Sequence, residues 1–373
     1  MNGQRLVLAT GGSGGHIYPA LAVAEQLQAH GHDLLFVGQQ GGMEARIIPA
    51  AGFAFAAVRA GKWARGRPDP RQALQALLGL GDALRRVRKH NPALVVGFGG
   101  FASFPALAAA RLLGIPIALH EQNAFPGRVT RWFAGQAQLL ALADAGAAQH
   151  LPTSCHVEVV GLPIRETRIS KDEARHALGL PASGLVTLVM GGSQGSVALN
   201  QAVPEAYQML PQALRESMTV LHSSGTGHAQ RLQTAMTDPN YRILPYVDAT
   251  LAWSAADLAI TRAGMSTLAE AAFHGVPLIM VPLPTAAENH QAHNARAVES
   301  AGAGKVVLQS ELDDLAEAWR ELLDDGARQA AASAARRLSP EGAAARLAHQ
   351  IEALLGSAPP SPIPTGAPHQ EKQ

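Results

Sequence analysis

Short apolar runs alternate along the chain with longer segments in which apolar residues recur at helical spacing. The runs are bounded by glycine, proline or polar residues, as buried strands are, and the longer segments predict helices. Strands are expected near residues 5–10, 33–37, 53–58, 94–101, 116–119, 157–162, 185–190, 218–223, 242–247, 258–260 and 278–281. Helices are expected near 19–29, 43–50, 69–89, 198–210, 267–274 and 341–355, with others starting near 103 or 105 and near 290. This alternation predicts an α/β fold with parallel sheets.

The two halves of the chain repeat one layout without repeating one sequence. Each opens with a strand, a glycine loop (Gly11 to Gly15, Gly191 to Gly195) and a helix. A chain of 373 residues usually needs more than one core, so two facing Rossmann-like domains are expected, at 1–162 and 163–340. Residues 357–373 are proline-rich and polar, which predicts a disordered tail.

Composition excludes several classes of protein. With 47% hydrophobic and 16% charged residues the chain is not disordered, and a net charge of +1 gives no general argument for nucleic acid binding. Cys155 is the single cysteine and no signal peptide is recognisable, so a reducing cytosol is expected. The uncharged window 94–110 contains glycines and a proline and ends at Arg111, which favours strand, loop and helix over a membrane span.

Glycine loops follow two strands of the first half, at Gly11 to Gly15 and at Gly97 to Gly100. A glycine loop between a strand and a helix is typical of an anion site. The first loop lacks the third glycine of a dinucleotide fingerprint, where Ile17 stands, and no acidic residue ends the second strand, so NAD is not expected. The P-loop pattern also fails.

The segment from Asp257 to Asn294 carries the densest set of polar groups beside strand ends. Gly264 permits close backbone approach, and Ser266, Thr267 and Glu270 offer hydroxyl and carboxylate groups. Such a set fits a phosphorylated, polyhydroxylated molecule such as a nucleotide sugar. Spacing alone also allows a capping box, in which Thr267 caps the helix and Glu270 bonds back to the cap.

The same segment resembles a known family. TRAGMSTLAEAAFHGVP followed by AAENHQAHNA resembles the donor-site signature of the bacterial glycosyltransferases that convert lipid I to lipid II. The loops GGSGGH and GFGGF and the stretch HEQN are similar to other parts of that family's site. The resemblance implies the GT-B fold, with a final helix (341–356) that returns to the first domain. It also implies inverting transfer of N-acetylglucosamine from UDP-GlcNAc to the 4-hydroxyl of the MurNAc of lipid I in peptidoglycan synthesis.

By this resemblance Glu270 holds the ribose hydroxyls, Tyr246 and Val247 meet the uracil, and Arg165 faces the donor phosphate. Met265 departs from the small residue expected there. The donor residues implied are Ser13, Gly14, Gly15, Asn123, Arg165, Ser193, Tyr246, Val247, Met265, Ser266, Thr267, Leu268, Ala269, Glu270, His290 and Gln291. The residues implied for the acceptor diphosphate are Gly12, Gly14, Gly15, Gly99, Gly100 and Phe101.

The reaction needs a base and a way to stabilise the departing diphosphate. No Asp-x-Asp pair occurs, so helix amino termini at Ser193 and Ser266, with Arg165, are expected to take that charge without a cofactor or an obligatory divalent metal. His16, at the end of the first glycine loop, is the candidate base because imidazole titrates near neutral pH. A structural role for His16 is nearly as well supported, and Glu121 is the reserve candidate.

Two other functions fit parts of the sequence. Ser13 and Ser193 both satisfy the G-x-S-x-G pattern of serine hydrolases, with Glu270 and His290 later in the chain. The duplicate motif and the absence of an HGGG-type loop argue against a hydrolase. A second UDP-sugar enzyme of the same fold, such as a UDP-GlcNAc 2-epimerase, is the nearer alternative.

A basic segment predicts where the chain meets its lipid-linked acceptor. The segment from Arg59 to His90 contains nine Lys or Arg residues but only two aspartates, and leucines recur there at helical spacing. The first domain is therefore expected to sit peripherally on the cytoplasmic face of the bacterial inner membrane, an anionic surface, through Lys62 to Lys89. The alternative is that the leucines face the core and the arginines are solvated. The helical positions concerned are Leu74, Leu77, Leu78, Leu84 and Val87.

Overall fold

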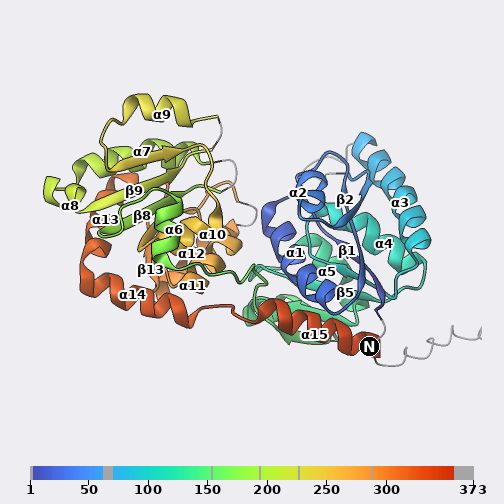
Figure 1. Cartoon of the computed structure of the whole chain (residues 1–373). Coiled ribbons are helices and arrows are strands. Elements are labelled where there is room, and N and C mark those ends of the chain that lie inside the picture. The colour runs from blue at the N-terminus through green and yellow to red at the C-terminus, as the bar shows by residue number, and fades with distance from the viewer. Residues whose placement is uncertain are drawn as a thin grey trace, which may run out of the picture.

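The computed structural model describes residues 3–61, 70–152, 154–192, 195–225, 227–286 and 289–356, with only the backbone described at 70–73. The chain forms two parallel sheets, each covered by helices, which lie side by side as separate lobes (Figure 1). The α/β prediction is confirmed.

The first sheet has the strand order β3-β2-β1-β4-β5-β6-β7. Its central strands are apolar on both faces because helices cover both, and Val7, Val95 and Leu140 are fully buried. The strands are β1 (Arg5–Ala9), β2 (Asp33–Gln39), β3 (Ala54–Val58), β4 (Leu94–Gly97), β5 (Ile117–Glu121), β6 (Leu139–Leu142) and β7 (Val157–Val159). The helices are α1 (Gly14–Ala29), α2 (Glu44–Ala50), α3 (Pro70–His90), α4 (Phe104–Leu112) and α5 (Arg128–Phe133).

The second sheet has the order β10-β9-β8-β11-β12-β13. Trp253 and Trp319 are its largest fully buried side chains, one in each of two hydrophobic clusters. The strands are β8 (Leu185–Met190), β9 (Met218–Ser223), β10 (Tyr241–Leu244), β11 (Leu258–Thr261), β12 (Leu278–Met280) and β13 (Gly304–Val306). The helices are α6 (Lys171–Ala177), α7 (Val197–Met209), α8 (Gln212–Glu216), α9 (Ala229–Ala235), α10 (Ala249–Ala255), α11 (Met265–His274), α12 (His290–Ser300), α13 (Leu315–Leu323) and α14 (Asp325–Arg337).

The last described helix, α15 (Ala343–Gly356), leaves the second lobe and packs beneath the first (Figure 1). Leu347 and Ile351 are fully buried in the first sheet's core beside α1. Glu352 also accepts hydrogen bonds from His30 at 2.8 Å and His32 at 3.2 Å. The chain therefore crosses between its two lobes twice, at residues 160–170 and again at 338–342.

Three predicted helix starts are corrected. α1 begins at Gly14 rather than Pro19, because a proline near the start of a helix costs few backbone hydrogen bonds. α11 begins at Met265 with Gly264 as its N-cap, so the capping box at Thr267 and Glu270 is wrong. α7 begins at Val197 and is capped by Ser196. β13 was not predicted, since its three residues carry no apolar run.

None of the helices in the described ranges is both long enough and apolar enough to span a bilayer.

Candidate functional site

The carboxyl ends of both sheets face one cleft, and the amino ends of α1 and α11 meet there. A Cβ atom placed on Gly15 would lie 3.7 Å from Ser13 Oγ and 3.9 Å from both Gln122 Nε2 and Ser266 Oγ. Buried oxygens of Ser266 and Gln122 have no hydrogen-bond partner among the described residues. Polar groups from both domains thus surround the space over Gly15, where a polar ligand fits.

The two glycine loops of the first domain support each other. A Cβ on Gly100 would lie 2.2 Å from the Gly11 carbonyl, so only glycine permits this contact. The buried Glu44 accepts hydrogen bonds from the N–H groups of Gly12 at 3.3 Å and Gln39 at 2.9 Å. The Gly12 N–H is therefore already used, and an acceptor diphosphate would rely on its neighbours in the loops.

His16 lies in the first turn of α1, between the two glycine loops. Its Nδ1 is 2.7 Å from Ser13 Oγ, and its ring borders Gly99 and Gly100. Burial, followed by the nearby His290 and His120, lowers the pKa of His16 to about 4. The ring is therefore neutral at neutral pH, which is the protonation state that a general base needs.

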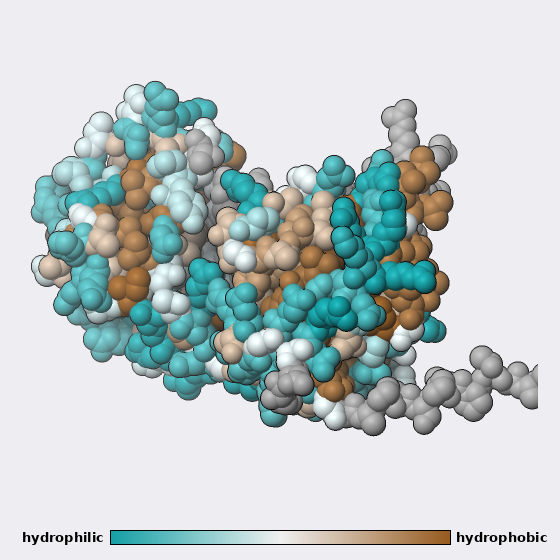
Figure 2. Space-filling model, turned by 45° about the vertical axis from the view of Figure 1, so that its right-hand side comes forward, coloured by the Kyte–Doolittle hydropathy of each residue, from teal (hydrophilic) through white to brown (hydrophobic). Residues whose placement is uncertain are grey.

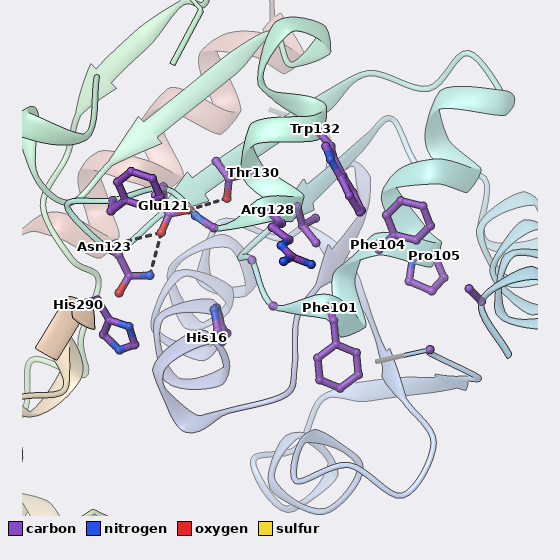
Figure 3. A pocket seen from close by; sticks show the side chains of 17 residues that line it. His16, Phe101, Phe104, Pro105, Glu121, Asn123, Arg128, Thr130, Trp132 and His290 are labelled. Atoms are coloured by element: carbon purple, nitrogen blue, oxygen red, sulfur yellow. Dashed lines mark hydrogen bonds between the residues drawn. The ribbon is translucent and has the colours of Figure 1, made fainter. Parts of the chain in front are cut away.

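Glu121, the reserve base, is held by four donors. Its Oε1 accepts hydrogen bonds from the backbone N–H and the side-chain amide of Asn123, both at 3.0 Å. Its Oε2 accepts from the Gly127 N–H at 2.9 Å and the Thr130 hydroxyl at 2.6 Å (Figure 3). Since both oxygens are used and the residue is 3% exposed, the geometry favours a role in fixing the loop and Asn123.

A pocket opens from His16 over the first domain (Figure 3). Its inner wall holds Gly99, Gly100 and Phe101, as predicted for the acceptor side. Its outer wall is aromatic, because Phe104 and Trp132 pack edge to face with ring centroids 5.7 Å apart. The side chains labelled in Figure 3 are His16, Phe101, Phe104, Pro105, Glu121, Asn123, Arg128, Thr130, Trp132 and His290.

A second pocket spans the cleft toward α11. It brings together many of the predicted donor residues with Tyr18 and Glu25 of α1. The predicted residues that line it are Gly14, Gly15, Arg165, Tyr246, Val247, Met265, Ser266, Thr267 and Glu270. Tyr246 is 65% exposed at its rim, as a side chain that stacks on a base must be, while the Val247 side chain is buried.

Glu270 lies in the wall of this donor pocket and accepts a hydrogen bond from Trp253 Nε1 at 2.9 Å. Burial raises the pKa of Glu270 to about 7, although the Trp253 hydrogen bond acts in the opposite direction. Near neutral pH the carboxyl group thus titrates, and its ionised form is the stronger acceptor for hydroxyl groups.

Arg165 reaches the donor pocket from the linker and is held by Glu25 at 2.9 Å. Both side chains are largely exposed. Exposed pairs contribute roughly 0–1 kcal/mol, so a phosphate can displace Glu25 from Arg165 at little cost.

Several predicted donor residues lie elsewhere. Leu268 and Ala269 bury their side chains in hydrophobic clusters, so only their backbone atoms can meet a ligand. Asn123 and His290 line the acceptor-side pocket, and Gln291 Oε1 accepts the Leu283 N–H at 2.9 Å. Ser193 lies outside the described residues.

Sequence reasoning missed Arg262, which organises the donor side. Its guanidinium donates to Ser196 Oγ at 3.1 Å, to the carbonyls of Val281 and Pro282, and to Gln309 at 2.8 Å. It therefore joins the loops that follow β8, β12 and β13. Arginine directly after a buried strand was a usable signal, because a buried guanidinium must find several acceptors.

Two parallel-sheet domains with a cleft at their carboxyl ends, bridged by a returning helix, define the GT-B fold, which glycosyltransferases share. Comparison with known families gives the particular class. Residues 6–141 match the glycosyltransferase family 28 N-terminal domain, and residues 186–350 match the family's C-terminal domain.

Close relatives carry one name, UDP-N-acetylglucosamine--N-acetylmuramyl-(pentapeptide) pyrophosphoryl-undecaprenol N-acetylglucosamine transferase. The protein of Deinococcus deserti is 46% identical, with 94% of this chain and 98% of the relative covered. That of Thermus thermophilus is 44% identical, with 94% and 100% covered. The chain belongs to this family of N-acetylglucosamine transferases.

Solved structures agree on the fold. MurG of Acinetobacter baumannii matches with a TM-score of 0.74 at 29% identity, covering 94% of this chain and 99% of that one. The calicheamicin glycosyltransferase CalG4 matches with a TM-score of 0.69 at 18% identity, covering 96% and 100%, which is a likeness of fold alone. The predictions of family, fold and enzyme class are confirmed, and the hydrolase alternative finds no support here.

The family resemblance implies that Glu270 holds the ribose hydroxyls, so Glu270→Ala is expected to weaken UDP binding about tenfold or more. In the wild type, UDP affinity should rise as pH rises through about 7, where Glu270 ionises. Calorimetric titration between pH 6 and 8 measures both effects. Glu270→Gln is the matched control, since the second ionisation of the UDP phosphate, at a pH of about 6, affects both proteins alike and only the wild type should show the further rise through about 7.

The raised pKa of Glu270 also predicts the direction in which stability changes with pH. The folded state favours protonated Glu270, so the wild type loses free energy of unfolding as pH rises through about 7, and Glu270→Gln does not.

An unchanged UDP affinity in Glu270→Ala would exclude the ribose role.

Proposed function

We propose that this chain transfers N-acetylglucosamine from UDP-GlcNAc to the 4-hydroxyl of the MurNAc of lipid I and so forms lipid II. The main support is the 46% identity to a relative with this activity in its name, over nearly the full length of both chains. The two pockets that meet at Gly15 and His16 support it independently, because a transferase needs a donor side and an acceptor side that share one reaction centre.

On the donor side, the uracil lies against Tyr246 and the Val247 backbone, and Glu270 accepts the ribose hydroxyls. The diphosphate lies at the amino end of α11, where free N–H groups and the helix dipole favour negative charge. Arg165 leaves Glu25 and adds a cation. Ser193, in the loop before α7, is assigned to the same diphosphate, as its sequence position suggests.

Stabilisation by these protein groups makes an obligatory divalent cation unnecessary in our proposal. Among the residues that the structure describes, no cluster of three or more His, Cys, Asp or Glu is arranged to hold a metal ion. In this proposal the positive charge comes from Arg165 and the helix amino end.

On the acceptor side, the sugar lies over Gly99 and Gly100 with its 4-hydroxyl toward His16. Nδ1 of His16 is engaged with Ser13, so Nε2 is the nitrogen that takes the proton during in-line attack on the anomeric carbon. The bond from this carbon to the UDP oxygen breaks as the new bond forms, which inverts the configuration. Arg128, which lines the acceptor pocket, is a cation suited to the acceptor diphosphate.

The lipid tail of the acceptor requires a peripheral place on the cytoplasmic face of the inner membrane, and α3 is the part that we assign to it. Leu74 is 54% exposed and Leu77 is 67% exposed, whereas Ala83 and Val87 are buried in the first sheet's core. Figure 2 shows hydrophobic surface on the flank of the first domain that carries α3. Lys62 to Pro68, also part of the predicted segment, lie outside the described residues.

Transfer of labelled N-acetylglucosamine from UDP-GlcNAc to a soluble lipid I analogue tests the function directly. Product is expected with the wild type both with and without EDTA, because no step needs a metal. Activity that EDTA abolishes and magnesium restores would contradict the leaving-group account. Release of UDP without an acceptor product would contradict the transferase.

His16→Ala is expected to lower turnover about 100-fold or more, because the acceptor hydroxyl loses its base, while UDP affinity stays near normal. The measurement is single-turnover transfer together with UDP calorimetry. Glu121→Gln serves as comparison, and its main effect should be on thermal stability and acceptor KM. Near-normal turnover in His16→Ala would remove His16 from the mechanism.

Changing Leu74 and Leu77 together to Glu should abolish binding to anionic vesicles at low salt. Each basic residue near an anionic surface contributes about 1 kcal/mol at best, so inserted leucines are needed as well. Co-sedimentation measures binding. Met209→Glu, an equally exposed apolar residue in the second domain, is the control. Undiminished binding in the double variant would move the membrane surface elsewhere.

A further inference from the structure

A polar hollow of about 400 Å³ lies outside the two substrate pockets, between the linker, α10, the end of α11 and α14. It shares only Trp253 and His274 with the donor pocket. Its charged and polar lining residues are Arg168, Lys171, Ser254, Asp257, His274, Arg328, Gln329 and Arg336.

Positive charge dominates this hollow. Asp257 is the single carboxylate that lines it, and that group is already engaged by Lys171 at 2.6 Å, by Arg175 at 2.7 Å and by the Val186 N–H at 2.8 Å. Arg168 pairs with Glu341 at 3.0 Å. Arg328 pairs with Asp325, and Arg336 also lines the hollow. The hollow and its ion-pair partners therefore comprise five cationic groups and three carboxylates: Arg168, Lys171, Arg175, Arg328 and Arg336 against Asp257, Asp325 and Glu341.

Arg336 is the cation left over. Within the described ranges no hydrogen bond or ion pair engages its guanidinium. Its exposed side chain lies against Gly275, since a Cβ there would lie 2.7 Å from Arg336 Cγ and 2.9 Å from its Nη1. Gly275, the left-handed C-cap of α11, thus leaves room for an arginine to lie across the helix end.

His274 does not add to the charge. Burial, followed by the nearby Arg168, lowers the pKa of His274 to about 4, so its ring is neutral at pH 7. A neutral imidazole can still donate one hydrogen bond to an anion. The positive excess therefore comes from guanidinium and ammonium groups, which suit phosphate oxygens well.

We propose that this hollow is an anion site for a phosphate group, with Arg336, Arg168 and Lys171 as its ligands. The site is separate from the donor diphosphate site on the other side of Trp253. The assignment rests on the charges and packing around the hollow, and only its test draws on the proposed function, through UDP in the donor pocket.

Calorimetric titration of the full chain with inorganic diphosphate tests the site, with saturating UDP present to occupy the donor pocket. One diphosphate per chain is expected to bind at the hollow, in addition to any that the acceptor loops hold. Arg336→Glu should weaken that binding about tenfold or more, because a charged hydrogen bond is lost and repulsion replaces it. Arg337→Glu is the matched control, since it carries the same charge change one residue along α14 outside the hollow.

The absence of diphosphate binding to the UDP-saturated wild type would overturn the proposal. Equal weakening in both variants would also overturn it, since that result reports net charge alone. Thermal melting of both variants checks that they fold, and Lys171→Gln gives a second, milder test. Sedimentation with phosphatidylglycerol vesicles separates two sources of the phosphate: weaker vesicle binding in Arg336→Glu than in Arg337→Glu indicates a lipid headgroup, and equal binding indicates a soluble anion.

Discussion

The cleft depends on one contact, where the amino ends of α1 and α11 meet over Gly15. Two helix amino ends carry partial positive charge, so bringing them together is unfavourable unless negative charge lies between them. The unpartnered oxygens of Ser266 and Gln122 at this place add to the demand for a ligand. A diphosphate would supply the negative charge and accept a hydrogen bond from the Ser266 hydroxyl, whereas the Gln122 amide oxygen needs a donor such as a sugar hydroxyl.

Buried or partly buried charged groups keep the loops around this contact in place. Glu44 and Glu121 each fix one loop of the first domain, and Arg262 ties three loops of the second. In each case a charged side chain bonds to backbone groups that would otherwise be unsatisfied. The site is thus organised before substrate arrives, which lowers the entropy lost on binding.

Much of the fold was predictable because most β strands here are buried apolar runs, and several of them, such as β1, β4 and β8, run into glycine loops. Helix starts were less predictable, since Pro19 and Thr267 are good start signals that the chain places inside helices. The roles of Glu44 and Arg262 depend on partners 32 and 66 residues away, and local sequence could flag Arg262 as a residue in need of acceptors but could not name its partners. The helix predicted from the apolar periodicity near 69–89 is present as α3, but that periodicity does not reveal that Val87 is buried while Leu77 is exposed.

The fold alone does not choose between a transferase and an epimerase. A putative UDP-N-acetylglucosamine 2-epimerase of Listeria monocytogenes matches this chain with a TM-score of 0.68 at 14% identity, so both chemistries share the architecture. The aromatic pocket in front of His16, lined by Phe104 and Trp132, favours a transferase over an epimerase. An epimerase acts on its nucleotide sugar alone and has no need of a second apolar pocket. A transferase with a bulky acceptor does need one, next to His16, the proposed base, and bordered by α3 through Ala76.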